Sequence, residues 1–215
     1  MRALLLALAF ATTPALAHAQ GWGMNTSHGP LNRGSFTSAG VSVQWDRCTN
    51  MQRTYDPAVS IENCDRLLAQ SDSSPSSLGA IYWYRAMRNL DAGDRTRYED
   101  DLKRAGEVFS TYIADNPRRF DGYVNRAAVL TRLGEFDLAL ADYERAAGLE
   151  SGASEPWQGR GCILFRRGDY AGANDAYNRA ARIAARTATT DSGHHSTNCV
   201  ARAALRESFD EAETL

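Results

Sequence analysis

Apolar residues recur at three- and four-residue spacing along most of the chain, and no stretch shows the strict alternation typical of a half-buried strand. The apolar positions predict helices over residues 58–69, 78–90 and 98–114, helical pairs within 123–147 and 157–184, and a last helix near 199–212. The pattern therefore predicts an all-α fold.

Turn and cap residues separate these segments. Asp56 followed by Pro57 is typical of a helix start, because an aspartate accepts from the first free backbone N–H groups and proline suits the first turn. Pro117 ends a helix, since it cannot continue the helical hydrogen bonding. Gly134 and Gly168 lie where each later pair must turn back on itself.

Residues 120–153 and 154–187 share one design, which makes a period of 34 residues. Tyr123 and Trp157 are aromatic residues at matching places, and Ala127 and Gly161 are matching small residues. Small residues let two antiparallel helices approach closely, while aromatics fill the gaps between successive helices. One such unit cannot bury its own apolar face, so stacking of units is expected to supply the core.

This pattern resembles the tetratricopeptide repeat, in which antiparallel helix pairs stack into a short α-solenoid. The resemblance implies an array over 41–186: a degenerate repeat (41–77), an interrupted repeat (78–119) and two full repeats (120–153 and 154–187). In the interrupted repeat Gly93 matches Gly134, and about seven extra residues are then needed before Ala105 fits. We expect these extra residues to form an insertion near 94–100, between the two helices of the interrupted repeat.

The two ends of the chain differ from the array. Residues 1–19 have the charge of Arg2, a short apolar run and small residues that suit cleavage after Ala17 or Ala19, so they predict a secretory signal peptide. The run is too short for a ~30 Å hydrocarbon core, and no membrane insertion is expected after cleavage. We expect a flexible leader over 20–40 and a polar loop with a capping helix over 188–215. The predicted location is the periplasm of a Gram-negative bacterium, or secretion.

Export changes the interpretation of the four cysteines, since an oxidising compartment favours disulfides. Three pairings of Cys48, Cys64, Cys162 and Cys199 are possible. The register of the tetratricopeptide resemblance places Cys48 and Cys64 at facing positions of one helix pair, which favours a disulfide over two buried thiols. A bond between Cys162 and Cys199 would then tie the capping helix to the array.

The resemblance implies that the chain binds a protein or peptide in a concave groove. The groove positions fall on the first helix of each repeat: Trp83, Met87, Asn125, Arg132, Gln158, Phe165 and Arg166. Aromatic side chains would supply contact area, and arginines would orient a carboxylate. The alternative is that Trp83, Met87 and Phe165 serve ordinary packing between repeats.

Four arginines recur at one place in the repeat: Arg47, Arg85, Arg126 and Arg160. They could form an anion-binding stripe along the array. We expect instead that each pairs with a carboxylate of a neighbouring helix, such as Asp142, and has a structural role.

Composition and motifs limit the other function classes. The formal net charge of −2 does not suit a nucleic-acid surface. No Walker loop, G-x-S-x-G, H-E-x-x-H or G-x-G-x-x-G motif occurs, so neither catalysis nor a cofactor is predicted. His194, His195 and Cys199 lack the further ligands and rigid frame of a metal site, so no metal is expected. The leading hypothesis is a binding scaffold. The alternatives are a self-assembling structural subunit of the envelope and an enzyme with an unrecognised site.

Overall fold

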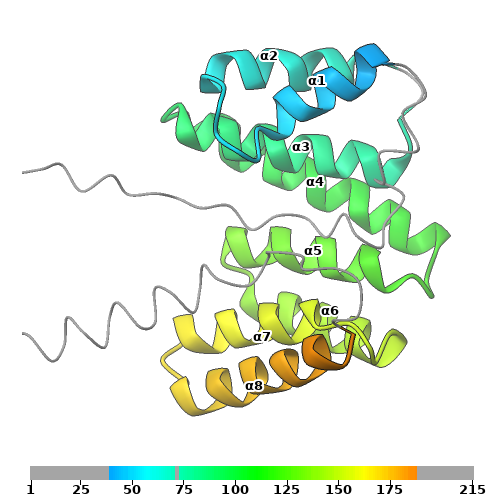
Figure 1. The fold of residues 1–215 in the computed structure, drawn as a ribbon, viewed down its shortest axis with the longest axis vertical. Coiled ribbons are helices and arrows are strands. Elements are labelled where there is room, and N and C mark those ends of the chain that lie inside the picture. The colour runs from blue at the N-terminus through cyan, green and yellow to red at the C-terminus, as the bar shows by residue number, and fades with distance from the viewer. Residues whose placement is uncertain (1–38, 71–72, 188–215) are drawn as a thin grey trace, which may run out of the picture.

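A computed structural model describes residues 39–70 and 73–187. Within these ranges the chain forms eight helices and no strand (Figure 1). They are α1 (Ala39–Thr49), α2 (Pro57–Leu68), α3 (Pro75–Asp91), α4 (Arg95–Asp115), α5 (Phe120–Leu133), α6 (Phe136–Leu149), α7 (Glu155–Arg166) and α8 (Tyr170–Thr187). The signal peptide, nearly all of the leader, His194, His195 and the capping helix lie outside the described residues and stay predictions.

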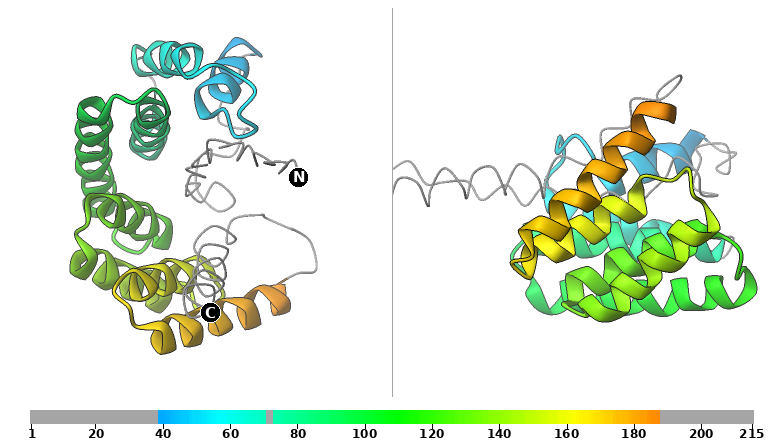
Figure 2. Two further views of the ribbon diagram at one scale, coloured as in Figure 1. Left: turned by 90° about the vertical axis from the view of Figure 1, so that its left-hand side faces the viewer. Right: turned by 90° about the horizontal axis from the view of Figure 1, so that it is seen from below.

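The helices pack as consecutive pairs, α1 with α2, α3 with α4, α5 with α6 and α7 with α8. Each pair stacks on the next, and Figure 2 shows the pairs following one another along an arc. The first helices also meet one another, because α1 contacts α3 and α5 contacts α7. The predicted all-α array of tetratricopeptide-like helix pairs is confirmed. We call α1, α3, α5 and α7 the inner helices.

The predicted turn and cap residues have the expected geometry. Gly93, Gly134 and Gly168 all adopt the left-handed conformation, with φ of 80°, 85° and 81° at the turn between the two helices of a pair. The Asp56 carboxylate accepts a hydrogen bond of 2.8 Å from the backbone N–H of Ala58 at the start of α2. None of the helices within 39–70 and 73–187 has the length and apolar character needed to cross a membrane.

The predicted insertion over 94–100 is wrong. Asp94 caps α4 and the helix begins at Arg95, so the turn after α3 is as tight as the later ones. The seven extra residues extend the far end of α4, which has 21 residues against 14 in α6. Seven residues are about two helical turns, so the shift leaves the apolar stripe on the same face. The apolar pattern therefore could not distinguish the two registers.

The two added turns of α4 fill the space between neighbouring inner helices. A Cβ atom on Gly79 of α3 would lie 2.7 Å from the ring of Phe109, and one on Gly122 of α5 would lie 2.9 Å from the ring of Tyr112. Both aromatic residues belong to the extension, and both are buried. The extension thus packs α4 against the helix before it and the helix after it.

The disulfide predicted between Cys48 and Cys64 is confirmed. It joins α1 to α2 with the Cα atoms 4.7 Å apart, and both residues are fully buried. Gly161 and Tyr177 occupy the equivalent positions in the last pair, where a Cβ on the glycine would lie 2.8 Å from the tyrosine ring. The same inter-helix contact is therefore made by a covalent bond in the first pair and by a small residue under an aromatic ring in the last.

The second disulfide reaches beyond the described residues. Cys162 is buried on α7, and no cysteine within the described ranges is a free thiol. Cys199 lies outside those ranges, so its pairing with Cys162 stays a prediction.

Candidate functional site

The predicted groove residues all lie on the inner helices, with an exposure that rises from α3 to α7. Trp83 and Met87 on α3 are buried, and so is Asn125 on α5. Arg132, Gln158 and Phe165 are half-buried, and Arg166 at the end of α7 is exposed. The inner face is therefore closed at α3 and accessible around the end of α7.

Two contacts connect the inner helices of successive repeats. The guanidinium of Arg132 lies 5.8 Å from the centroid of the Trp83 ring, which links α5 to α3. Arg166 donates a hydrogen bond of 3.2 Å from Nη1 to the carbonyl of Thr131, beside Arg132, which links α7 to α5. We call Trp83, Arg132 and Arg166 the inner row.

Trp83 and Asn125, both predicted groove residues, each carry a buried polar atom with unused hydrogen-bonding capacity. The indole N–H of Trp83 and the side-chain oxygen of Asn125 are buried and have no partner in the described part of the chain. Trp83 is 0% exposed and Asn125 is 2% exposed. A buried polar group without a partner typically costs about 1–3 kcal/mol. Trp83 thus carries an unused donor and Asn125 an unused acceptor.

Aromatic residues at the turn ends of the last two pairs extend the accessible region. Phe136 lies under two guanidinium groups, with that of Arg166 at 4.9 Å and that of Arg167 at 5.6 Å from its centroid. Phe165 meets Tyr170 edge-on at 5.3 Å, and Tyr170 is 57% exposed. Sequence reasoning did not include Phe136 or Tyr170 among the groove residues. The consecutive arginines Arg166 and Arg167, directly after Phe165, were the signal that could have marked this region.

The expected ion pairs of the recurring arginines form in the two middle repeats. Arg85 on α3 binds both carboxylate oxygens of Asp101, at 2.6 and 2.9 Å, and Asp65 at 2.6 Å. Arg126 on α5 binds both oxygens of Asp142 at 2.7 Å. Hydrogen bonding to Asp142 raises the pKa of Arg126. The structural role is confirmed for these two arginines.

The other two recurring arginines contact aromatic rings. Arg47 lies 5.8 Å from the centroid of Tyr55. Arg160 lies 5.7 Å from the centroid of Trp157, and Arg179 of α8 lies 3.8 Å from the same ring. The position shared by the four arginines therefore has two roles in this chain, and Arg160 differs from its equivalents in the middle repeats.

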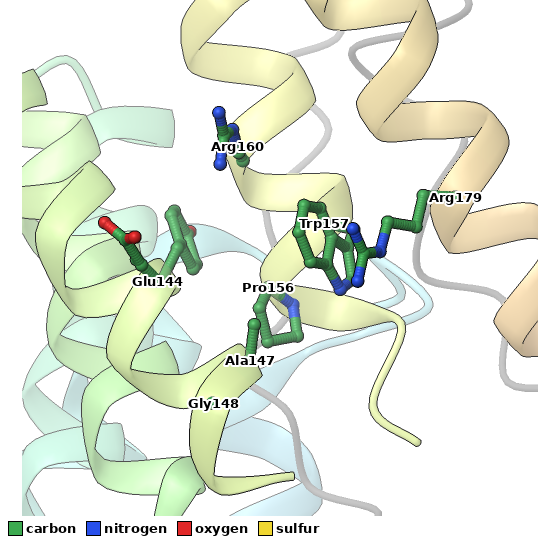
Figure 3. A pocket seen from close by; sticks show the side chains of 8 residues that line it. Glu144, Ala147, Gly148, Pro156, Trp157, Arg160 and Arg179 are labelled. Atoms are coloured by element: carbon green, nitrogen blue, oxygen red, sulfur yellow. The ribbon is translucent and has the colours of Figure 1, made fainter. Parts of the chain in front are cut away.

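A cavity of about 240 Å³ lies where α6, α7 and α8 meet. Figure 3 shows its lining, with Trp157 between Arg160 and Arg179, and Glu144 projecting from α6. Tyr143, Ala147, Gly148 and Pro156 complete the walls. Sequence reasoning treated Trp157 as a repeat-packing aromatic and did not consider Arg179.

One further charged group is buried at the junction of the first two pairs. Arg88 of α3 is 6% exposed, and burial lowers its pKa while Asp91 opposes that shift. It pairs with Asp91 at 3.2 Å, and Asp91 also binds Arg53 at 2.8 Å. These contacts hold the α1–α2 pair on α3. In the described part of the chain, no group of three histidine, cysteine or acidic residues could hold a metal ion.

Comparison with known proteins finds no sequence family whose model matches the chain. Two crystal structures of MamA are each 21% identical to it. One covers 69% of this chain and 80% of that chain with a TM-score of 0.43, and the other covers 70% and 75% with a TM-score of 0.42. MamA from residue 41 onwards, from Desulfovibrio magneticus RS-1, is 11% identical over 72% of this chain and 100% of that chain, with a TM-score of 0.38. These likenesses are weak, so the assignment of the fold depends on the helix pairs of the chain itself.

Proposed function

We propose that the chain is an exported binding scaffold that holds a polypeptide segment of a partner protein against its inner helices and performs no chemistry itself. The observation that carries the proposal is the inner row, because Arg132 contacts Trp83 on α3 and Arg166 bonds the Thr131 carbonyl on α5, so contacts connect the inner helices of three successive repeats. A row of this kind suits an extended segment, which must be contacted at several points along its length.

The side chains near the open end of the inner face have the chemistry that such recognition uses. Arg132 and Arg166 can donate to carbonyl or carboxylate oxygens, and Phe165 offers apolar area.

The proposed location is the periplasm. The signal peptide predicted over residues 1–19 supports export. The Cys48–Cys64 disulfide supports an oxidising compartment, since thiols are kept reduced in the cytosol.

The inner face can be tested by site-specific photo-crosslinking in cells. A photo-reactive amino acid replaces Gln158, and adducts are compared between the parent chain and Arg132→Ala/Arg166→Ala. We expect about tenfold less adduct in the double variant, because two donors to the partner are lost. Trp83 is left intact, since it is fully buried and its removal would change stability as well as binding.

The matched control is Arg145→Ala/Arg182→Ala, which removes two exposed arginines from α6 and α8. Its adducts should remain at the parent level. An unchanged adduct pattern in Arg132→Ala/Arg166→Ala would contradict the inner-face site. An adduct of this chain with itself would instead support the self-assembling subunit.

A further inference from the structure

The last repeat lacks the carboxylate that neutralises its recurring arginine. Arg85 and Arg126 each bind an aspartate sixteen residues later in the chain. The residue sixteen positions after Arg160 is Ala176, which is buried on α8. An alanine at this position leaves Arg160 without the carboxylate that neutralises Arg85 and Arg126. Arg160 is therefore available to an external anion.

Arg160 is joined by a second guanidinium on the same aromatic platform. Arg160 and Arg179 both lie against the Trp157 ring, and both are exposed. Neither forms an ion pair with a described residue, although Glu144 lines the same cavity. Stacking on the indole holds the two groups in position before any ligand arrives, which reduces the entropy lost on binding.

The size and charge of the cavity indicate the class of ligand. Its volume of about 240 Å³ is below the range of roughly 300–1,000 Å³ for small-molecule sites, so it suits a single side chain. Two arginines and one glutamate give a net charge of about +1. That charge complements one carboxylate better than a doubly charged phosphate group.

We propose that the cavity formed by Trp157, Arg160 and Arg179 binds a glutamate or aspartate side chain of a polypeptide partner. The carboxylate would accept hydrogen bonds from the two guanidinium groups, and the methylene carbons would lie on the indole. Arg160 and Gln158 are about 160° apart around α7. The cavity is therefore a second contact surface on the scaffold, on the opposite face of α7 from Gln158.

The test measures the indole N–H resonance of Trp157 by NMR in the full chain, with Trp157→Phe used to assign it. The titrants are a capped pentapeptide, Gly-Phe-Glu-Phe-Gly, the same peptide with glutamine in place of glutamate, and inorganic phosphate. We expect a saturable shift with the glutamate peptide and about tenfold weaker binding of the glutamine peptide. Equal binding of both peptides, or tighter binding of phosphate, would overturn the proposal.

Two variants locate the binding to the cavity. Arg160→Gln/Arg179→Gln should weaken the glutamate peptide about tenfold, while Arg182→Gln, an exposed arginine of the same helix, should leave its affinity unchanged. Ala176→Asp restores the carboxylate found in the middle repeats and should compete for Arg160, with binding weakened about fivefold. Unchanged affinity in Arg160→Gln/Arg179→Gln and in Ala176→Asp would show that the peptide binds elsewhere. An equal loss in the control Arg182→Gln would show the same. The inner-face variants Arg132→Ala/Arg166→Ala should bind the peptide normally, so this test and that of the inner face can fail independently.

Discussion

The hydroxyl groups of Tyr84 and Tyr177 lie in surroundings that oppose their ionisation. Tyr84 on α3 is 4% exposed and packs edge-on against Trp45, with ring centroids 5.9 Å apart. Burial raises the pKa of Tyr84 to about 12, while the charge of Arg88 opposes the shift. Burial likewise raises the pKa of Tyr177 on α8 to about 12. Folding therefore favours the neutral form of both residues.

This shift predicts a loss of stability at high pH. The pKa of Tyr84 is higher in the folded state than its ordinary value of about 10, so its contribution is intact below pH 10 and is lost between about pH 10 and 12. Tyr84→Phe removes that titration. Between about pH 9 and 11.5 the variant should lose roughly 2 kcal/mol less unfolding free energy than the parent chain, measured by urea denaturation. Tyr170→Phe, at a tyrosine that is 57% exposed, is the matched control. Identical losses in Tyr84→Phe and the parent would contradict the prediction.

How closely two helices pack depends on where a glycine of one helix faces an aromatic ring of the other. On α7, Gly159 faces Tyr143 of α6, and a Cβ atom there would overlap three atoms of the tyrosine ring. Tyr143 is 2% exposed, so its ring cannot move aside without disturbing its neighbours. Gly159 therefore sets how closely the third and fourth pairs stack.

Gly159→Ala should accordingly destabilise the array by about 1–3 kcal/mol, the usual range for overpacking in a core. Gly148→Ala is the matched control, because the Cβ it would add near the end of α6 meets nothing within 4 Å beyond its chain neighbours and the adjacent backbone of α6. Alanine favours helix over glycine, so this control should be neutral or stabilising by up to roughly 1 kcal/mol. Denaturant unfolding followed by circular dichroism measures both. Equal stability of the two variants would show that α7 can shift away from Tyr143.

The described helix pairs form an array in which each pair depends on its neighbours. Within the described chain the α1–α2 pair packs on one neighbouring pair, through α3. Its disulfide, with a sequence separation of 16 residues, stabilises this pair by restricting the unfolded chain.

Removal of this bond should affect one end of the molecule only. Cys48→Ala/Cys64→Ala should lower the stability of the α1–α2 pair by roughly 3 kcal/mol, the loop-entropy value for a loop of this length. Hydrogen exchange should show faster exchange in α1 and α2 and unchanged protection in α5 to α8. An equal increase in all the described helices would mean that the array unfolds as one cooperative unit.

The sequence by itself determined the repeat, the turn glycines and the Asp56 cap, and its resemblance to the tetratricopeptide repeat favoured the pairing of Cys48 with Cys64. These features follow from local rules: the helical period, the left-handed conformation that glycine adopts easily, and a register that two full repeats establish. The ion pairs of Arg85 and Arg126 follow from the same register. Such features need no knowledge of how one pair is placed on the next.

Only the tertiary structure decided the rest. The apolar stripe could not place the seven extra residues of α4, because two helical turns return to the same face. Sequence position marked Trp83, Met87 and Asn125 as groove residues, but stacking of the neighbouring helices buries them and leaves Arg166 accessible. The cavity at Trp157 brings together residues from three helices, and the missing aspartate at Ala176 acquires meaning only when Arg160 and Arg179 meet there. The exposure of a side chain and the balance of charges around it are set by contacts between helices. Those contacts depend on the distances between helices, which the period of the sequence does not specify.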